Sequence, residues 1–324
     1  MNYSLIRLSF DSAVHFGPSQ SAQSLSTSED HIAADTLFSA LCHTALQLDG
    51  PEGLERLCTW VREDSFLLSD TMPWQGEEYY LPKPFVLSDR TREIPASQAK
   101  AMKKLPWIPV SGFAEFSESI RGGEPFDPEK YSTSFGFRVS AARAQIWDGD
   151  DAEPYRIGMY QFAENSGLYF LAGTRTQEQK EVLRSLVDAL GWSGIGGKIS
   201  TGCGRFHVDC WTDLNTDDDA QSQWLYNALG NQGDQGLLLT SSLPREEELE
   251  KALDGASYQV LRRGGFVGSN TYSETPMKKQ TQYFLQAGST IVNRYTGDLY
   301  PVGSFGSHPV YRYGKPLFLG VKLT

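Results

Sequence analysis

The chain has 324 residues, of which 40% are hydrophobic and 21% charged, and its formal net charge is −11. Its length and composition fit a globular protein of two domains, and its acidity argues against a free-standing nucleic-acid-binding protein, which is usually basic. No apolar run could cross a membrane, and the four cysteines form no CxxC pair or disulfide framework, so we expect a cytoplasmic protein with reduced thiols.

The first predicted elements are a strand, a loop and a helix. Residues 4–10 alternate between apolar and polar side chains, which is typical of a strand. The Ser-rich loop that follows is placed to present His15, Gly17 and Ser19 to a ligand, although a plain flexible loop is the alternative. Residues 33–48 carry an apolar stripe of a helix that Gly50-Pro51 ends, and residues 53–62 predict a second short helix.

Residues 97–143 have no long hydrophobic period, and a structureless span of this length is usually functional or mobile. Basic residues, among them Arg138 and Arg143, alternate there with aromatic residues. This composition suits single-stranded RNA, whose bases stack on aromatic rings. Aromatic core residues beneath a long loop explain it equally well, so both explanations stay open.

The next segment predicts a hairpin, a helix and a Gly-rich loop. Residues 157–162 and 168–172 form the expected hairpin around Asn165-Ser166-Gly167. Thr176 and Gln179 make a capping box for a helix that Gly191 ends. The Gly-rich loop, Ser193 to Phe206, follows this helix and leads into a strand at 205–211.

The Gly-rich loop matches neither of two common phosphate-binding loops. Ile199 stands where a Walker A loop needs Ser or Thr, and the order helix, loop, strand does not fit a dinucleotide-binding fingerprint. Glycines nevertheless permit close backbone approach, and a basic residue with two hydroxyls suits phosphate. A surface connection is the alternative. The candidate RNA-binding residues of the loop are Gly196, Gly197, Lys198, Ser200, Thr201 and Arg205.

The remaining chain predicts an acidic linker at 212–235 and a second domain at 236–324, with a helix near 244–253 and strands at 237–242, 258–261, 281–285, 289–292 and 310–321. Residues 255–324 contain eight basic residues and only two acidic ones, so this domain is basic within an acidic chain. Its candidate RNA-binding residues are Arg262, Arg263, Tyr311 and Arg312.

The order of elements predicts an α+β protein with two ferredoxin-like (RRM-like) domains. Each unit reads strand–helix–strand–strand, and a helix and a strand complete the first, which spans residues 1–211. RRM-type domains bind RNA on the exposed face of their antiparallel sheet, and we expect the same here. No spacing of histidines and cysteines suits a metal, and no nucleophile elbow is present, so no metal, cofactor or catalytic residue is expected.

Several segments together resemble the RAMP superfamily of CRISPR RNA-binding proteins. Within it, the chain is most similar to the group-5-like subunits of type III-A (Csm) effector complexes, which cap the crRNA 5′ end. The matching segments cover nearly the whole chain and are VHFGPSQSAQS, HIAADTLFSALCHTAL, RVSAARAQ, GWSGIGGKISTGCGRF and HPVYRYGKPLFLGV.

The resemblance implies two ferredoxin-like domains, a Gly-rich loop before the last strand of the first, and a thumb-like insertion at about 97–143. It further implies a non-catalytic subunit that binds the 5′ handle of crRNA, beside a large polymerase-like subunit and a backbone RAMP subunit. Two alternatives remain: a metal-independent repeat endoribonuclease with His15 as general acid and base, and a protein that binds some other ligand.

Overall fold

The computed structural model describes residues 1–18, 25–86, 96–145, 153–269, 272–303 and 306–323. Its central sheet has the strand order of a ferredoxin-like domain. β9 (Phe206–Asp213), β1 (Asn2–Phe10) and β8 (Ser166–Thr174) are neighbours, and β2 (Phe66–Leu68) and β3 (Met72–Gln75) both pair with β8. Every pairing is antiparallel, with Leu5 opposite Leu171. The predicted α+β class is therefore confirmed, with a ferredoxin-like order in the first unit.

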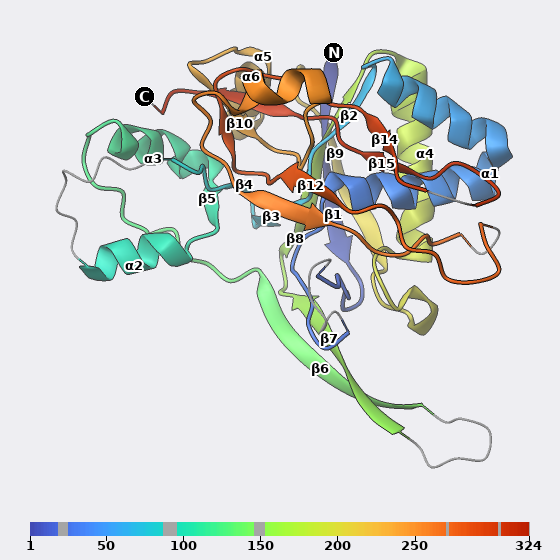
Figure 1. Ribbon diagram of the computed structural model, residues 1–324. Coiled ribbons are helices and arrows are strands. Elements are labelled where there is room, and N and C mark those ends of the chain that lie inside the picture. Colours follow the sequence, from blue (N-terminus) through green and yellow to red (C-terminus); the bar gives the residue numbers. More distant parts are fainter. Residues whose placement is uncertain (19–24, 87–95, 146–152, 270–271, 304–305, 324) are drawn as a thin grey trace.

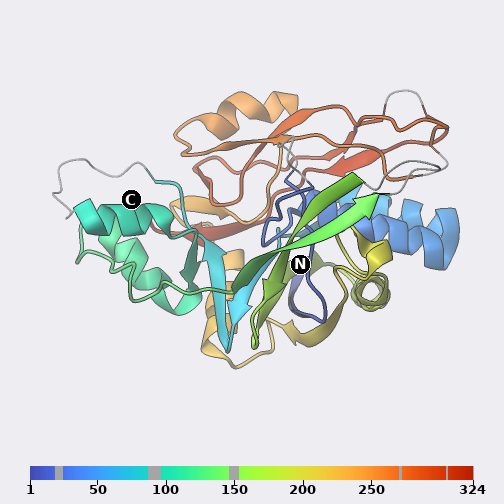
Figure 2. The ribbon, with the colours of Figure 1, turned by 90° about the horizontal axis from the view of Figure 1, so that it is seen from below.

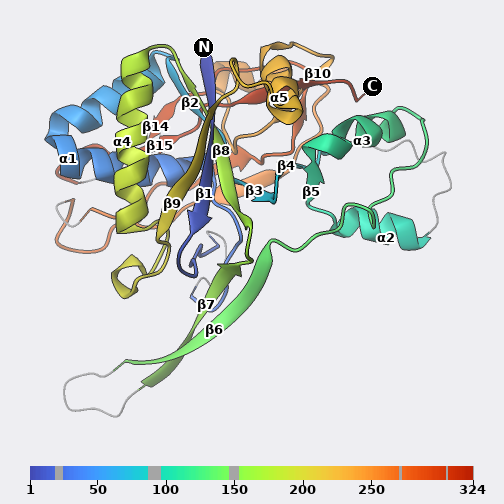
Figure 3. The ribbon, with the colours of Figure 1, turned by 180° about the vertical axis from the view of Figure 1, so that it is seen from behind.

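Two helices cover one face of this sheet (Figure 3). They are α1 (Ala34–Arg62) and α4 (Gln177–Ser193). Thr176 caps α4 through the predicted capping box with Gln179. α1 contains both predicted helices, which Gly50 separates with a φ of 68° just before Pro51. Ile6, Leu8 and Phe170 point from the sheet into the core beneath these helices.

The opposite face of the sheet is buried as well, so the prediction of an exposed sheet surface for RNA is wrong. Leu5, Tyr169 and Leu171 lie in a second core with Leu237 and Leu319 of the C-terminal unit. All nine residues of β8 are buried. Because apolar residues alternate onto both faces of β1 and β8, both faces require a covering layer.

The inserted span is folded rather than structureless. β4 (Glu78–Pro82) and β5 (Trp107–Pro109) extend the sheet, followed by a 3-10 turn η1 (Val110–Gly112) and α3 (Phe113–Ile120), while α2 (Ala96–Lys104) precedes β5. The core explanation of the aromatic residues holds for most of them. Buried rings belong to Trp107, Phe113, Phe116, Phe126 and Phe135.

The insertion ends in a long two-stranded hairpin that projects from the body (Figure 1). We call this hairpin of β6 (Gly136–Gln145) and β7 (Glu153–Phe162) the thumb. Its register runs from Gly136 opposite Phe162 to Gln145 opposite Glu153. The predicted hairpin between 157–162 and 168–172 is wrong, since β7 pairs with β6 and β8 joins the central sheet. Local turn residues at 165–167 could not reveal that distant partner.

The acidic segment contains α5 (Ala220–Gly230), which packs beside β16 (Phe318–Val321) of the C-terminal unit. The Asp219 carboxylate caps this helix by accepting hydrogen bonds from the amides of Gln221 (2.9 Å) and Ser222 (3.1 Å). Leu225 and Leu229 are buried in the second core. The segment is therefore a folded part of the body, and not only a linker.

The C-terminal unit is built from short strands. A three-stranded sheet has the order β13 (Thr290–Ile291), β10 (Gln235–Leu238), β16 (Phe318–Val321). β11 (Val260–Arg263) pairs with β12 (Gln282–Leu285). Between β10 and β11 lie a 3-10 turn η3 (Glu246–Glu248) and α6 (Leu249–Leu253).

The expected strand 310–321 is two strands, because residues 314–317 belong to neither. The first, β15 (Tyr311–Tyr313), pairs with β14 (Leu299–Pro301) and packs on α1. A Cβ at Gly314 would lie 2.6 Å from the Tyr300 ring, so any larger residue there would have to displace this ring. In the described part of the chain, no helix is long and apolar enough to span a membrane.

Candidate RNA-binding site

The Gly-rich loop packs against residues 13–16 at the base of the thumb. The amide of Gly197 donates to the His15 carbonyl at 2.8 Å, and the amide of Gly204 donates to the Ala13 carbonyl at 3.0 Å. A Cβ at Gly196 would lie 2.8 Å from the His15 oxygen, and one at Gly197 would lie 2.7 Å from His15 Cδ2. The close contact between the loop and His15 therefore requires glycine at both positions. Contact of either with RNA stays a prediction.

The polar residues of the loop point away from that contact. A 3-10 turn, η2 (Ile199–Thr201), follows Lys198, which has a φ of 62°. Ser200, Thr201 and Arg205 are exposed, and Lys198 is half-buried with its Nζ 5.8 Å from the centre of the Tyr155 ring on the thumb. The loop and the thumb therefore present basic and hydroxyl groups beside one another.

His15 is a buried, hydrogen-bonded residue. Its side chain is 6% exposed, and its Nδ1 donates to the Gly158 carbonyl on β7 at 2.6 Å. The ring lies beneath Gly197, where it would clash with any Cβ added to that glycine. A general acid or base must reach a substrate proton. Gly17 is exposed nearby, and Ser19 lies outside the described residues.

The thumb carries basic side chains on both faces. Arg143 lies opposite Tyr155, and Ala142 lies opposite Arg156, so the two arginines occupy opposite faces of the ribbon. Both are exposed. Arg138, also exposed, lies on the face of Arg156, and its Nε contacts the Ser28 carbonyl at 3.4 Å. The sequence patterns did not single out Arg156, although the adjacent predicted strand at 157–162 could have indicated it.

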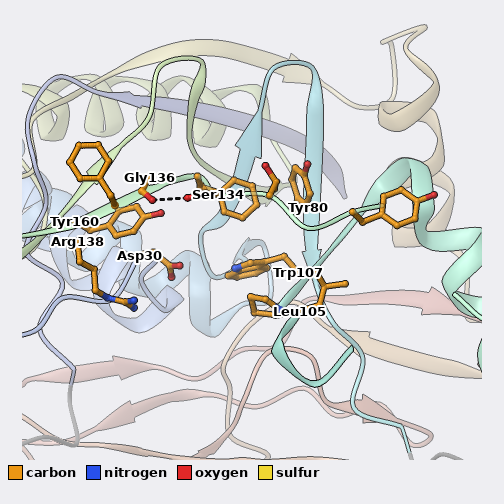
Figure 4. A pocket seen from close by; sticks show the side chains of 13 residues that line it. Asp30, Tyr80, Leu105, Trp107, Ser134, Gly136, Arg138 and Tyr160 are labelled. Carbon is orange, nitrogen blue, oxygen red and sulfur yellow. Dashed lines mark hydrogen bonds between the residues drawn. The ribbon is translucent and has the colours of Figure 1, made fainter. Parts of the chain in front are cut away.

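A cavity of about 230 Å³ lies at the base of the thumb, between it and the residues at the start of β5 (Figure 4). Trp107, Phe137 and Tyr160 contribute aromatic rings, and Asp30 and Arg138 contribute charges. Although burial acts to raise the pKa of Asp30, the hydrogen bond from His31 holds it below its ordinary value. Burial and the nearby Asp30 raise the pKa of Tyr160 to about 12. The aromatic rings and the Arg138 guanidinium of this cavity suit a planar, unpaired base as a ligand.

The candidates of the C-terminal unit have contacts within the chain. Arg263 Nε donates to Asp35 Oδ2 at 2.9 Å, and Arg312, 4% exposed, donates to the carbonyls of Arg263 and Gln280 at 3.2 and 3.0 Å. The half-buried Tyr311 ring lies 4.9 Å from the guanidinium of Arg62. These three residues join the unit to α1. We therefore do not carry them into the RNA site, whereas Arg262 is exposed on β11.

A ferredoxin-like unit with a Gly-rich loop and a thumb, completed by a second unit of short strands, defines a protein of the RAMP class. A family model described as the CRISPR Csm4 C-terminal domain matches residues 231–321. A relative from Mycobacterium tuberculosis, CRISPR system Cms protein Csm4, is 35% identical over 99% of this chain and 98% of its own length. A Streptococcus thermophilus relative of the same name is 27% identical over the full length of both. The chain belongs to the Csm4 family.

Solved structures share the fold. Csm4 in a Csm1-Csm4 cassette with pppApA superposes with a TM-score of 0.63, at 20% identity, over 100% of this chain and 99% of the other. A Csm3-Csm4 subcomplex of the type III-A CRISPR-Cas interference complex gives a TM-score of 0.61, at 18% identity, over 98% of this chain and 99% of the other.

Proposed function

We propose that this chain is the non-catalytic subunit that caps the repeat-derived 5′ handle of crRNA in a type III-A interference complex. Its partners in this role are the large polymerase-like subunit and the first copy of the backbone RAMP subunit. The two similar structures pair Csm4 with Csm1 and with Csm3, which supports these partners.

One observation carries the proposal: the Gly-rich loop, with Lys198 and Arg205, and the thumb, with Arg143, lie on one side of the molecule. In the view from below, the thumb crosses in front of the body and the yellow Gly-rich loop lies to one side of it (Figure 2). Basic side chains that can contact successive phosphates, with aromatic rings nearby on which bases can stack, suit single-stranded RNA. The net charge of −11 opposes binding by the isolated chain, so the handle is held only within the assembled complex.

The endoribonuclease alternative receives less support. The buried His15 ring and its hydrogen bond to Gly158 suit a residue that positions the loop on the thumb. Incubation of the pure protein with repeat RNA and EDTA tests the alternative directly, since specific cleavage would favour the nuclease.

The proposal is tested by reconstituting the complex with crRNA and measuring the apparent Kd at several salt concentrations. Lys198→Ala combined with Arg205→Ala should weaken binding about tenfold or more and lower the salt slope by about two. Lys251→Ala is the matched control, because α6 lies on the side away from the thumb (Figure 1). Equal affinity of the double variant and the control would refute the proposed site.

A further inference from the structure

A second cluster of cations lies where α1 meets the C-terminal unit. We call Arg263, Lys279 and Arg312 the interdomain cation cluster, and His43 and His308 lie beside it. Arg263 and Arg312 both contact Asp35, with Arg312 Nε 3.5 Å from Oδ2. His308 Nε2 lies 2.9 Å from the Ser269 hydroxyl, and a Cβ at Gly268 would lie 3.4 Å from His43 Nε2. The chain that follows β11 thus rests on the N-terminal half of α1.

The cluster contains more positive than negative charge. Asp35 is the one carboxylate that pairs with it among the described residues, whereas Arg263, Arg312 and Lys279 are all cationic. Lys279 is half-buried, and no carboxylate of the described chain lies within 4.0 Å of its ammonium group. Burial, helped by Arg312 and Arg263, lowers the pKa of Lys279 against the effect of Asp35. Burial, Lys279 and His308 likewise lower the pKa of His43.

Uncompensated charge at a partly buried site is unfavourable unless an anion completes it. We propose that the interdomain cation cluster binds a phosphodiester of single-stranded RNA through Lys279. This inference rests on the proposed function and adds a phosphate site in the C-terminal unit, away from the thumb and the Gly-rich loop.

Features around the cluster favour RNA over an acidic peptide. The ring of Phe266 is 57% exposed, and Lys278 Nζ lies 5.9 Å from the centre of this ring. Exposed rings among cations stack on unpaired bases. A Cβ at Gly265 would meet no atom within 4 Å, so the surface there is open to a backbone.

The position of the cluster also fits a continuous strand of RNA. Seen from below, α1 lies between the C-terminal unit and the Gly-rich loop, and the thumb reaches across the same side (Figure 2). A strand held by the thumb and the Gly-rich loop can therefore pass along α1 to reach Lys279.

Lys279→Gln in the reconstituted complex tests the proposal, with Lys251→Gln on α6 as the control. We expect Lys279→Gln to bind handle RNA about tenfold more weakly, with a salt slope lower by about one. In a series of handle RNAs with one neutral methylphosphonate each, one position should weaken binding to the wild type and have no further effect on Lys279→Gln. The RNA-free variant should melt at a higher temperature, because it loses a repelled, desolvated charge.

Three outcomes would overturn the inference. Normal RNA affinity with weaker capture of a neighbouring subunit would make the cluster a protein-docking site. A lower melting temperature without RNA would make Lys279 a structural residue. If the loss of affinity from Lys279→Gln adds to the loss from every single methylphosphonate, Lys279 does not contact any one phosphate of the handle. Failure of the proposed function is distinct, because the wild-type complex itself would then show no dependence on handle RNA.

Discussion

The carboxylate of Asp70 accepts hydrogen bonds from both the amide (2.9 Å) and the hydroxyl (2.6 Å) of Ser241, a residue of the other unit. Asp70 also accepts from the amide of Ala34, at the start of α1, at 2.7 Å. Burial nevertheless raises the pKa of Asp70 above its ordinary value. One buried acid thus joins the first unit, the start of α1 and the second unit.

We expect Asp70→Asn to be as stable as the wild type or more stable. An amide oxygen can accept from both backbone amides, and its NH₂ can donate to the Ser241 hydroxyl, without a buried charge. Asp70→Ala should cost about 2–4 kcal/mol, because it leaves buried donors without an acceptor. The pKa is raised on folding, so ionisation of Asp70 costs stability that grows as the pH rises towards the folded pKa. Urea titrations across pH test this, and an Asn variant as unstable as the Ala variant would contradict it.

Asp35 should behave in the opposite way. Burial acts to raise its pKa, but the Arg263 and Arg312 guanidinium groups outweigh burial and lower it. Its stabilising effect is therefore present above the unfolded pKa and is lost as the pH falls through the folded pKa. Asp35→Asn should cost about 3–5 kcal/mol by leaving two buried cations without their carboxylate. Thermal melting would show a loss near neutral pH that shrinks in acid; a loss that does not depend on pH would contradict the assignment.

Gly197→Ala tests whether glycine is required at this position by the contact of the loop with His15. The new methyl group would lie 2.7 Å from His15 Cδ2, so we expect a loss of about 1–3 kcal/mol in the free energy of unfolding. Gly230→Ala is the control, since its Cβ would meet nothing within 4 Å. If Gly197→Ala keeps full stability and still loses crRNA, the glycine is required by the RNA instead of by His15.

The thumb arginines should act on RNA without affecting stability. Arg143→Ala and Arg156→Ala each remove an exposed cation from opposite faces of the ribbon. Each should lower the salt slope of crRNA binding by about one, with no change in the melting temperature of the chain. A slope changed by only one of them would identify the face of the thumb that the RNA follows.

Local signals in the sequence predicted local structure well. The Thr176–Gln179 capping box and the break at Gly50 appear as expected, because each depends on a few neighbouring residues. The partner of β7 and the cover over the second face of β8 were missed, since both are set by segments far away in the chain. The same reason explains Arg263 and Arg312: an isolated basic residue does not reveal that Asp35 lies beside it.

The shared second core has a consequence for how this molecule unfolds. Leu5 and Leu171 from the central sheet pack with Leu237 and Leu319 from the C-terminal unit, so neither unit can bury its own apolar surface alone. Calorimetry should accordingly record one cooperative transition for the chain, with equal van't Hoff and calorimetric enthalpies. The segment 231–321, although matched by a family model of its own, is then only one part of a cooperative body, and its expression in isolation should yield an aggregating polypeptide.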